Sequence, residues 1–211
     1  MTSLSAGTLY YVRAYATNGA GTAYGSKISF TTSLQASGTV YDNDGNTYNY
    51  ITIGTQTWMA ENLKTTKYRN GETIANVTVQ ADWEALATGA YCWYNNDAAT
   101  NKATYGALYN WYAVADSRNI APTGWHVPTE AEWATLIENQ GVALVAGAKL
   151  KETGNSHWKA YNTDATNSSG FTALPGGYRR DDDGTFSVVG RYGYWCTTYD
   201  FSTLNAWVRV M

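Results

Sequence analysis

The sequence predicts an α+β fold with short strands, a few short helices and long loops, preceded by an N-terminal β-hairpin. Two stretches near the start, residues 8–18 and 26–32, alternate apolar and polar side chains with a period of two. One strong helix pattern covers residues 129–139. Most of the remaining chain consists of short apolar runs separated by Gly, Asp and Asn, which is typical of short strands joined by turns.

The predicted hairpin consists of two strands around a turn. Residues 8–18 alternate, so that two faces are expected: Tyr10, Val12, Ala14 and Ala16 on one, and Tyr11, Arg13 and Tyr15 on the other. The cluster NGAGTAYG forms the turn, and Ser26 to Thr32 forms the second strand. A two-stranded hairpin is marginally stable in water, so we expect this one to need a larger sheet.

The rest of the chain predicts several short elements. Residues 39–48 and 51–58 predict strands, with an Asp/Gly turn between Tyr41 and Thr47. Helices are expected over Gln80–Leu86, Thr129–Asn139 and Val142–Leu150. Thr129 and Glu132 have the spacing of a capping box, an apolar stripe of Trp133, Leu136 and Ile137 follows, and Gly141 ends the helix. From Gly170 onward the pattern indicates turns and short strands.

Composition excludes several classes of function. Only 15% of the 211 residues are charged, against about 25% in an ordinary soluble domain. A net charge of −3 argues against a nucleic-acid binder, which needs a basic surface. No apolar run reaches the roughly 18 residues of a membrane span, and the first residues lack the pattern of a signal peptide. Two Cys and two His offer little for a disulfide scaffold or a zinc site, and no cofactor is expected.

The N-terminal segment resembles a known module. The string Leu4-Ser-Ala-Gly7-Thr8-Leu-Tyr10-Tyr-Val12-Arg13-Ala-Tyr-Ala16-Thr-Asn18-Gly-Ala-Gly21 is similar to the last two strands of a fibronectin type III domain, with Ala6 where proline is usual. The resemblance implies that Tyr10 is the corner tyrosine that hydrogen-bonds to the chain upstream. It also implies that residues 1–33 are a fragment of such a domain and that the sequence is the cut end of a longer chain.

Residues 34–211 form the second predicted domain. Motifs in register from residue 39 to the end resemble the Fibrobacter succinogenes major paralogous domain, a family of secreted bacterial modules. They include Ile53-Gly54-Thr-Gln56-Thr-Trp58-Met59-Ala60-Glu61-Asn62-Leu63, Tyr91-Cys92-Trp93-Tyr94-Asn95-Asn96-Asp97, Pro122-Thr-Gly124-Trp125-His126-Val127-Pro128 and Gly170-Phe171-Thr-Ala-Leu174-Pro175-Gly176-Gly177-Tyr178-Arg179. The segment GWHVPTEAEW is also similar to formylglycine-generating enzymes. These resemblances imply a core of the C-type-lectin or formylglycine-generating-enzyme kind.

This chain departs from the family pattern at two positions. Ala121 stands where a cysteine is frequent, and the final cysteine-containing strand is missing because the sequence ends at Met211. We therefore expect a domain without its closing strand, with an open sheet edge or an incompletely covered core. Another chain, or the N-terminal hairpin, is a candidate to complement that edge.

Two acidic loops have alternative interpretations. Asp42-Asn43-Asp44-Gly45-Asn46 places oxygen side chains at alternate positions, as calcium loops do, but it lacks the distal bidentate glutamate. Asp181-Asp182-Asp183-Gly184 raises the same question, with Arg179 and Arg180 beside it. We favour ordinary turns at both places.

The histidines and cysteines give weak signals for chemistry. Neither His126 nor His157 has a second ligand at metal-binding spacing, so packed or hydrogen-bonded histidines are favoured and no metal site is predicted. Cys92 and Cys196 either form a disulfide or remain buried thiols, and we favour the unpaired state. No nucleophile motif supports a catalytic triad.

Aromatic residues are the most informative class. The chain has 18 Tyr and 9 Trp but only 4 Phe, and rings with a polar group suit half-buried surfaces. Trp58, Trp111, Trp125, Trp133 and Tyr109 are expected in the core. The predicted ligand-binding residues lie in the loop-rich C-terminal half, although the same rings also suit a loop-covered core: Arg179, Arg180, Tyr192, Tyr194, Trp195, Tyr199, Trp207 and Arg209.

These observations favour a non-catalytic recognition module outside the cell or at its surface, with carbohydrate or a cell-surface protein as its partner. A structural spacer of a surface adhesin is the alternative. An oxidase of the formylglycine-generating kind is less favoured, because that chemistry needs two cysteines in the C-terminal half and only Cys196 lies there. Neither nucleic-acid binding nor membrane insertion is expected.

Overall fold

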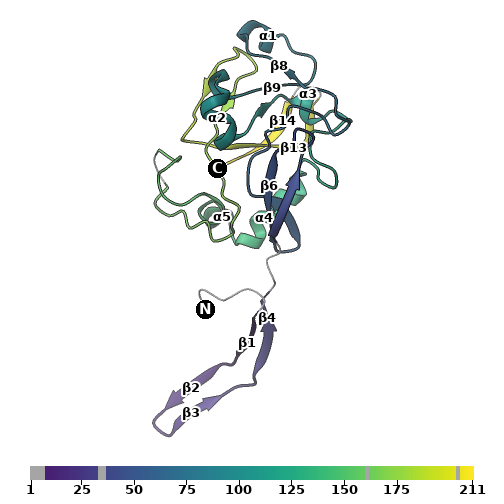
Figure 1. The fold of residues 1–211 in the computed structure, drawn as a ribbon. Coiled ribbons are helices and arrows are strands. Elements are labelled where there is room, and N and C mark those ends of the chain that lie inside the picture. Colours follow the sequence, from purple (N-terminus) through teal and green to yellow (C-terminus); the bar gives the residue numbers. More distant parts are fainter. Residues whose placement is uncertain (1–7, 33–36, 160–161, 203–204) are drawn as a thin grey trace. The chain divides into compact units, whose positions relative to one another are not determined.

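The computed structural model describes residues 8–32, 37–159, 162–202 and 205–211. The chain divides into two compact units, Met1–Ala36 and Ser37–Met211 (Figure 1). The sequence placed the boundary at residues 33/34, three residues earlier. The class is mixed α/β, with many short strands and short helices, as predicted.

Unit 1 is the predicted β-hairpin, divided into two paired segments. β1 (Leu9–Val12) pairs antiparallel with β4 (Ile28–Thr31), and β2 (Tyr15–Asn18) pairs antiparallel with β3 (Gly21–Tyr24). The strands are broken near Ala14 and Gly25, which keep one backbone hydrogen bond of 2.9 Å between them. Residues 1–7, which include the part of the chain a few positions upstream to which a corner tyrosine would bond, lie outside the described residues, and the fibronectin resemblance stays a prediction.

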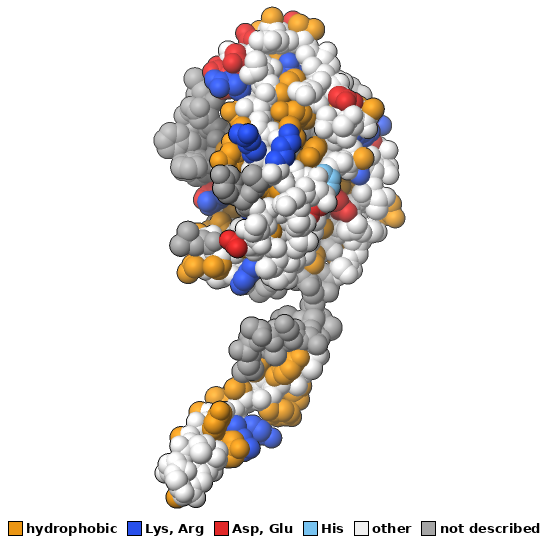
Figure 2. All heavy atoms as spheres, turned by 90° about the vertical axis from the view of Figure 1, so that its left-hand side faces the viewer, with side chains coloured by type: hydrophobic (Ala, Val, Ile, Leu, Met, Phe, Trp, Pro, Cys, Tyr) orange, Lys and Arg blue, Asp and Glu red, His pale blue; other side chains and the backbone are white. Residues whose placement is uncertain are grey.

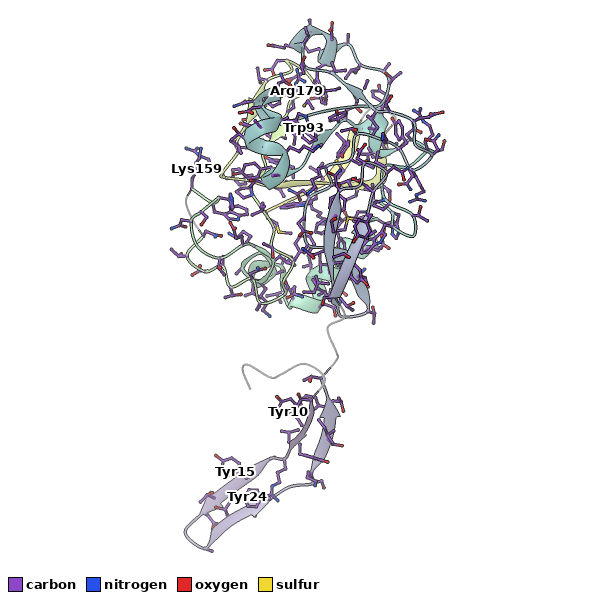
Figure 3. The ribbon with its side chains drawn as sticks, in the orientation of Figure 1. Tyr10, Tyr15, Tyr24, Trp93, Lys159 and Arg179 are labelled. Carbon is purple, nitrogen blue, oxygen red and sulfur yellow. The ribbon has the colours of Figure 1, made fainter. Side chains whose placement is uncertain are left out.

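The hairpin exposes its large side chains. Tyr15 and Tyr24 come from β2 and β3 and lie beside each other at a centroid distance of 6.2 Å (Figure 3), yet they are 71% and 57% exposed. Arg13 stacks on the Tyr24 ring and Lys27 on the Tyr11 ring. Figure 2 shows hydrophobic side chains along this surface, with basic ones beside them. This exposure agrees with the expectation that the hairpin is only marginally stable by itself.

Unit 2 contains several small sheets. A three-stranded meander, in the order β5-β6-β7, consists of β5 (Ser37–Tyr41), β6 (Thr47–Ile53) and β7 (Gln56–Met59). A second sheet, in the order β10-β9-β8, consists of β8 (Ala75–Asn76), β9 (Ala90–Cys92) and β10 (Leu108–Tyr109). Two further pairs are β11 (Tyr178–Arg179) with β12 (Phe186–Ser187), and β13 (Tyr194–Ser202) with β14 (Asn205–Val210).

The predicted helices are present with small shifts of their ends. They are α1 (Gln80–Glu84), α4 (Glu130–Gln140) and α5 (Ala143–Leu150). The capping box at Thr129 is confirmed: its hydroxyl accepts from the Glu132 N–H, and the Glu132 carboxylate accepts from the Thr129 N–H. Three short helical segments were not predicted: η1 (Tyr94–Asn96), α2 (Ala98–Tyr105) and α3 (Trp111–Val114).

Among the residues that the structure describes, the core of unit 2 consists of three hydrophobic clusters. The first joins β6, β7, α4, α5 and the segment after Gly170 around Trp58, Trp133, Leu136 and Phe171. The second gathers Tyr68, Ile74, Tyr91, Trp93, Ala113, Val114 and Ile120, and the third gathers Trp83, Ala90 and Cys92. Rings supply much of each cluster, so the high Tyr and Trp content is in large part a core feature.

The loop between β5 and β6 is the favoured turn. Asp42 Oδ1 accepts from the backbone N–H groups of Asp44 and Asn46 at 2.9 Å, and its Oδ2 accepts from the Tyr48 hydroxyl at 2.6 Å. Gly45 has φ +78°, a conformation that favours glycine. The acidic side chains of this loop are therefore hydrogen-bonded to the chain itself.

Asp44 predicts a specific pH dependence of stability. Partial burial raises the pKa of this carboxyl, but the Thr66 N–H, the hydroxyls of Thr66 and Thr65, and Lys67 outweigh it, so that the pKa is lowered. A lowered pKa contributes stability above the unfolded value near 4, and this contribution is lost as the pH falls through the folded value. The free-energy cost of Asp44→Asn is therefore expected to shrink between pH 6 and pH 2, measured by urea unfolding.

Thr66→Val is the control for that experiment, because it removes one hydroxyl donor and keeps the backbone N–H. Its pH dependence is expected to lie between those of the wild type and Asp44→Asn. A cost of Asp44→Asn that stays constant across the pH range would contradict the assignment.

Candidate functional site

Unit 2 contains a cavity of about 970 Å³ that opens to solvent. Strand β7, the start of α4, the loop before β11 and the hairpin β13–β14 all contribute to its wall. Its lining includes residues 55–63, 107–111, 124–128, 171–174, 176–181 and 194–196. This volume is at the upper end of the range for small-molecule sites, about 300–1,000 Å³.

An aromatic cluster forms one wall of the cavity. The Trp133 ring lies 4.9 Å from Trp58, 5.9 Å from Phe171 and 6.2 Å from Trp195, measured between ring centroids. The capping box of α4 fixes where Trp133 enters the fold, and β7 turns Trp58 inward between exposed or half-buried neighbours. The Trp133 indole N–H is buried and has no hydrogen-bond partner among the described residues. The wall is therefore mostly apolar.

Polar groups lie on the same wall beside the rings. The Trp195 indole N–H donates to Asn62 Oδ1 at 3.1 Å, and Asn62 Nδ2 donates to the Tyr105 carbonyl at 2.9 Å. At another part of the lining, His126 Nε2 lies 2.8 Å from Glu132 Oε1. Apolar rings next to oriented amide and carboxylate groups are the usual composition of a site that binds a polar organic ligand.

Two tyrosines and an arginine line another part of the cavity. Tyr178 on β11 and Tyr194 on β13 are both half-buried, and their ring centroids are 4.7 Å apart. Burial raises the pKa of Tyr194, so its hydroxyl stays protonated at neutral pH. Arg180 pairs with Asp182 and Asp183 at the surface, which makes the acidic loop an ion-paired turn, as favoured from the sequence.

Arg179 lies inside unit 2 (Figure 3), and its side chain is hydrogen-bonded to backbone carbonyls of the same unit. Its guanidinium donates to the carbonyls of Val77 at 2.7 Å, Thr78 at 3.1 Å and Gly184 at 2.9 Å. The same group stacks on the rings of Trp83 and Phe186, at 4.4 and 4.9 Å from their centroids. Arg179 is in the cavity lining, but its donors hold two distant segments together, so we leave it out of the proposed ligand contacts.

The eight predicted site residues are brought together only in part. Arg179, Arg180, Tyr194 and Trp195 line the cavity, whereas Tyr192 is 47% exposed outside its lining. Arg209 is paired with Glu130 at the start of α4. The side chains of Tyr199 and Trp207 lie outside the described part of the structure. Tyr178 and Asn62 line the cavity and were not singled out from the sequence, because no local pattern distinguishes them from other Tyr and Asn residues.

The remaining candidates are structural in their surroundings. His157 lies 2.9 Å from the Glu152 carboxylate, so both histidines are hydrogen-bonded, as favoured. Cys92 and Cys196 are free thiols, and burial raises the pKa of each to about 11. Where the chain is described, no group of three or more His, Cys, Asp or Glu side chains is arranged to hold a metal ion. Likewise, none of the described helices combines the length and apolar character that a membrane crossing requires.

The fold and the cavity define a mixed α/β domain with an aromatic, solvent-accessible pocket. Residues 51–211 match the family described as the Fibrobacter succinogenes major domain. The chain therefore belongs to this family, which confirms the second resemblance; its lectin-like core stays a prediction. No curated protein and no solved structure matches the chain.

Proposed function

We propose that this chain is a non-catalytic recognition module that acts outside the cell or at its surface, and that it binds carbohydrate or a cell-surface partner. The cavity of about 970 Å³ is the observation that supports this proposal most directly. Tyr178, Tyr194 and Trp195 supply rings that stack on the C–H faces of a sugar, and Asn62 and Arg180 supply polar groups for its hydroxyls.

The state of the two thiols favours a binding role over an oxidase. Cys92 belongs to the third core cluster and Cys196 packs against the second. Burial raises the pKa of both to about 11, whereas reactive cysteines have lowered pKa values in electropositive, accessible surroundings. A secreted location and a lectin-like core remain parts of the proposal, carried by the family resemblance.

Binding of glycans is expected to depend on the tyrosine pair. Each of the variants Tyr178→Ala and Tyr194→Ala is expected to weaken binding by about tenfold, because a stacked ring that is desolvated by a ligand contributes more than 1 kcal/mol. Binding of the 211-residue chain to a broad glycan array, followed by titration of tryptophan fluorescence, measures this effect.

Tyr41→Ala is the matched control, because Tyr41 is a 64% exposed tyrosine on β5 outside the cavity lining. It is expected to bind as the wild type does. If broad panels of glycans and of cell-surface proteins both give no signal, the recognition role is wrong and a structural spacer is the better interpretation.

A further inference from the structure

The backbone hydrogen bonds at the end of the β13–β14 pair show which residue pairs of the two strands are bonded to each other and which are not. Gly193 and Met211 exchange both backbone hydrogen bonds, at 3.0 and 3.2 Å. In an antiparallel pair, bonded and non-bonded residue pairs alternate along the strands. Val210, opposite Tyr194, and Val208, opposite Cys196, are therefore non-bonded positions, and their N–H and C=O groups point away from β13.

The outward groups are the peptide N–H and C=O groups of each strand that point away from the other strand. Those on and beside β13 have hydrogen-bond partners, whereas in the described residues those of Val208 and Val210 have none. On β13, the Thr198 N–H donates to the Pro128 carbonyl at 2.9 Å, and just before the strand the Tyr192 carbonyl accepts from the Gly177 N–H at 2.9 Å. Among the described residues, no strand and no backbone group pairs with the outward groups of Val208 or Val210. These valines are 40% and 48% exposed, so β14 is an open edge.

The open edge lacks the features that usually block strand addition. Exposed edges are normally interrupted by proline, lysine or a bulge. The three residues Val208-Arg209-Val210 contain no proline or lysine, and their register with β13 is regular, because the register shifts of this strand pair lie beyond Cys196. The Arg209 charge is paired with Glu130. Valine also favours the extended conformation. This stretch is therefore well suited to pair with another strand.

The edge also borders the cavity. Val208, Tyr194 and Cys196 share one face of the β13–β14 pair, and all three line the cavity. A strand added to β14 would place every second side chain on that same face. Apolar side chains at those positions would cover lining that is otherwise in contact with water, which is favourable at about 25 cal/mol per Å².

We propose that β14 accepts an extended segment of another polypeptide as a third strand, with alternating apolar side chains directed to the cavity face. Unpaired peptide groups in a row specify a polypeptide backbone, because its donors and acceptors repeat with the same spacing, which a saccharide does not match. This inference rests on the proposed recognition role, because it names a protein as the partner. The peptide would bind through backbone hydrogen bonds to the edge of β14, whereas a glycan would bind through stacking on Tyr178 and Tyr194.

Selection of peptides tests the proposal directly. A displayed library of random linear heptapeptides is the probe, selected on the full 211-residue chain. We expect enriched sequences to alternate apolar and polar residues. N-methylation of alternate peptide nitrogens in an enriched peptide is expected to weaken binding at least tenfold, whereas N-methylation of the intervening nitrogens is expected to leave it nearly unchanged, because only one set faces β14.

Val208→Pro is the matching change in the protein. It removes an N–H that β13 does not use, and proline is tolerated at such edge positions. Binding is expected to fall at least tenfold, whereas Val208→Thr, which keeps the N–H and the branched side chain, is expected to stay within about twofold. The N-methyl series decides the question even if Val208→Pro does not fold.

Two outcomes would overturn the proposal. The first is a library without enrichment, or enriched peptides whose binding is insensitive to N-methylation. The second is a wild-type chain that is a dimer by sedimentation and becomes a monomer in Val208→Pro, because the occupant of the edge would then be a second copy. Peptide binding that depends on the unmethylated nitrogens, together with silent glycan arrays, would leave this inference standing without the glycan role. Glycan binding without any enriched peptide would do the reverse, so failure of this inference and failure of the proposed function are distinguishable.

Discussion

Replacing Trp133 by alanine is expected to lower the free energy of unfolding by about 3–5 kcal/mol, the range for a buried tryptophan cut to alanine. Trp133 is 1% exposed and its ring contacts those of Trp58, Phe171 and Trp195. A loss of this size is a large part of the total stability of a domain, about 5–15 kcal/mol. Because all nine tryptophans lie after residue 57, tryptophan fluorescence during urea unfolding of the whole chain follows unit 2 alone.

The variant Trp133→Phe distinguishes the contribution of ring packing to stability from that of the indole N–H. Where the chain is described, the buried indole N–H has no partner, so its removal frees the core of an unsatisfied donor while the phenylalanine ring keeps most of the contacts. We expect this variant to lose about 1 kcal/mol, and Tyr192→Ala, at a 47% exposed position, to lose less still. Equal losses for the alanine and phenylalanine variants would contradict the packing role assigned to the ring.

Replacing Arg179 by leucine is expected to cost about 3–5 kcal/mol of unfolding free energy, whereas replacing the neighbouring, solvent-exposed Arg180 by leucine is expected to leave the stability nearly unchanged. Arg179 is 8% exposed, and its guanidinium satisfies the carbonyls of Val77, Thr78 and Gly184. Hydrogen bonds from a charged donor contribute about 1.5–3 kcal/mol each, and buried carbonyls left without a donor add a penalty. Arg180 forms a solvent-exposed ion pair, which contributes little.

Arg179→Lys is expected to restore only part of the loss, because one ammonium group cannot donate to the carbonyls of Val77, Thr78 and Gly184 as the forked guanidinium does. Urea unfolding at neutral pH, with glycan binding measured in parallel, checks both arginines. A folded Arg179→Leu variant with wild-type stability and no ligand binding would show that Arg179 belongs to the ligand site after all.

Local signals in the sequence were reliable where a few neighbouring residues decide the structure. The capping box of Thr129 and Glu132, the turn at Asp42 to Asn46 and the N-terminal hairpin all formed as expected. Helix α2 was missed because its cap, an Asp97 carboxylate that accepts from the Thr100 N–H, lies in a stretch rich in Asn and Ala without an apolar stripe. The family was also readable from the sequence, because its motifs stand in order along residues 51–211.

The candidate site depends on contacts between residues far apart in the chain, which local sequence patterns do not predict. Asn62 meets Trp195 across 133 positions, and Arg179 meets Val77 across 102. Nothing in the neighbourhood of Arg179 and Arg180 distinguishes the buried arginine from the exposed one, and the open edge of β14 follows from the register of two paired strands. The sequence alone therefore determined the local elements and the family, through capping, turn and side-chain chemistry that acts over a few residues. Tertiary packing alone decided which rings line the cavity and which peptide groups stay unpaired, because both depend on where distant segments come to rest.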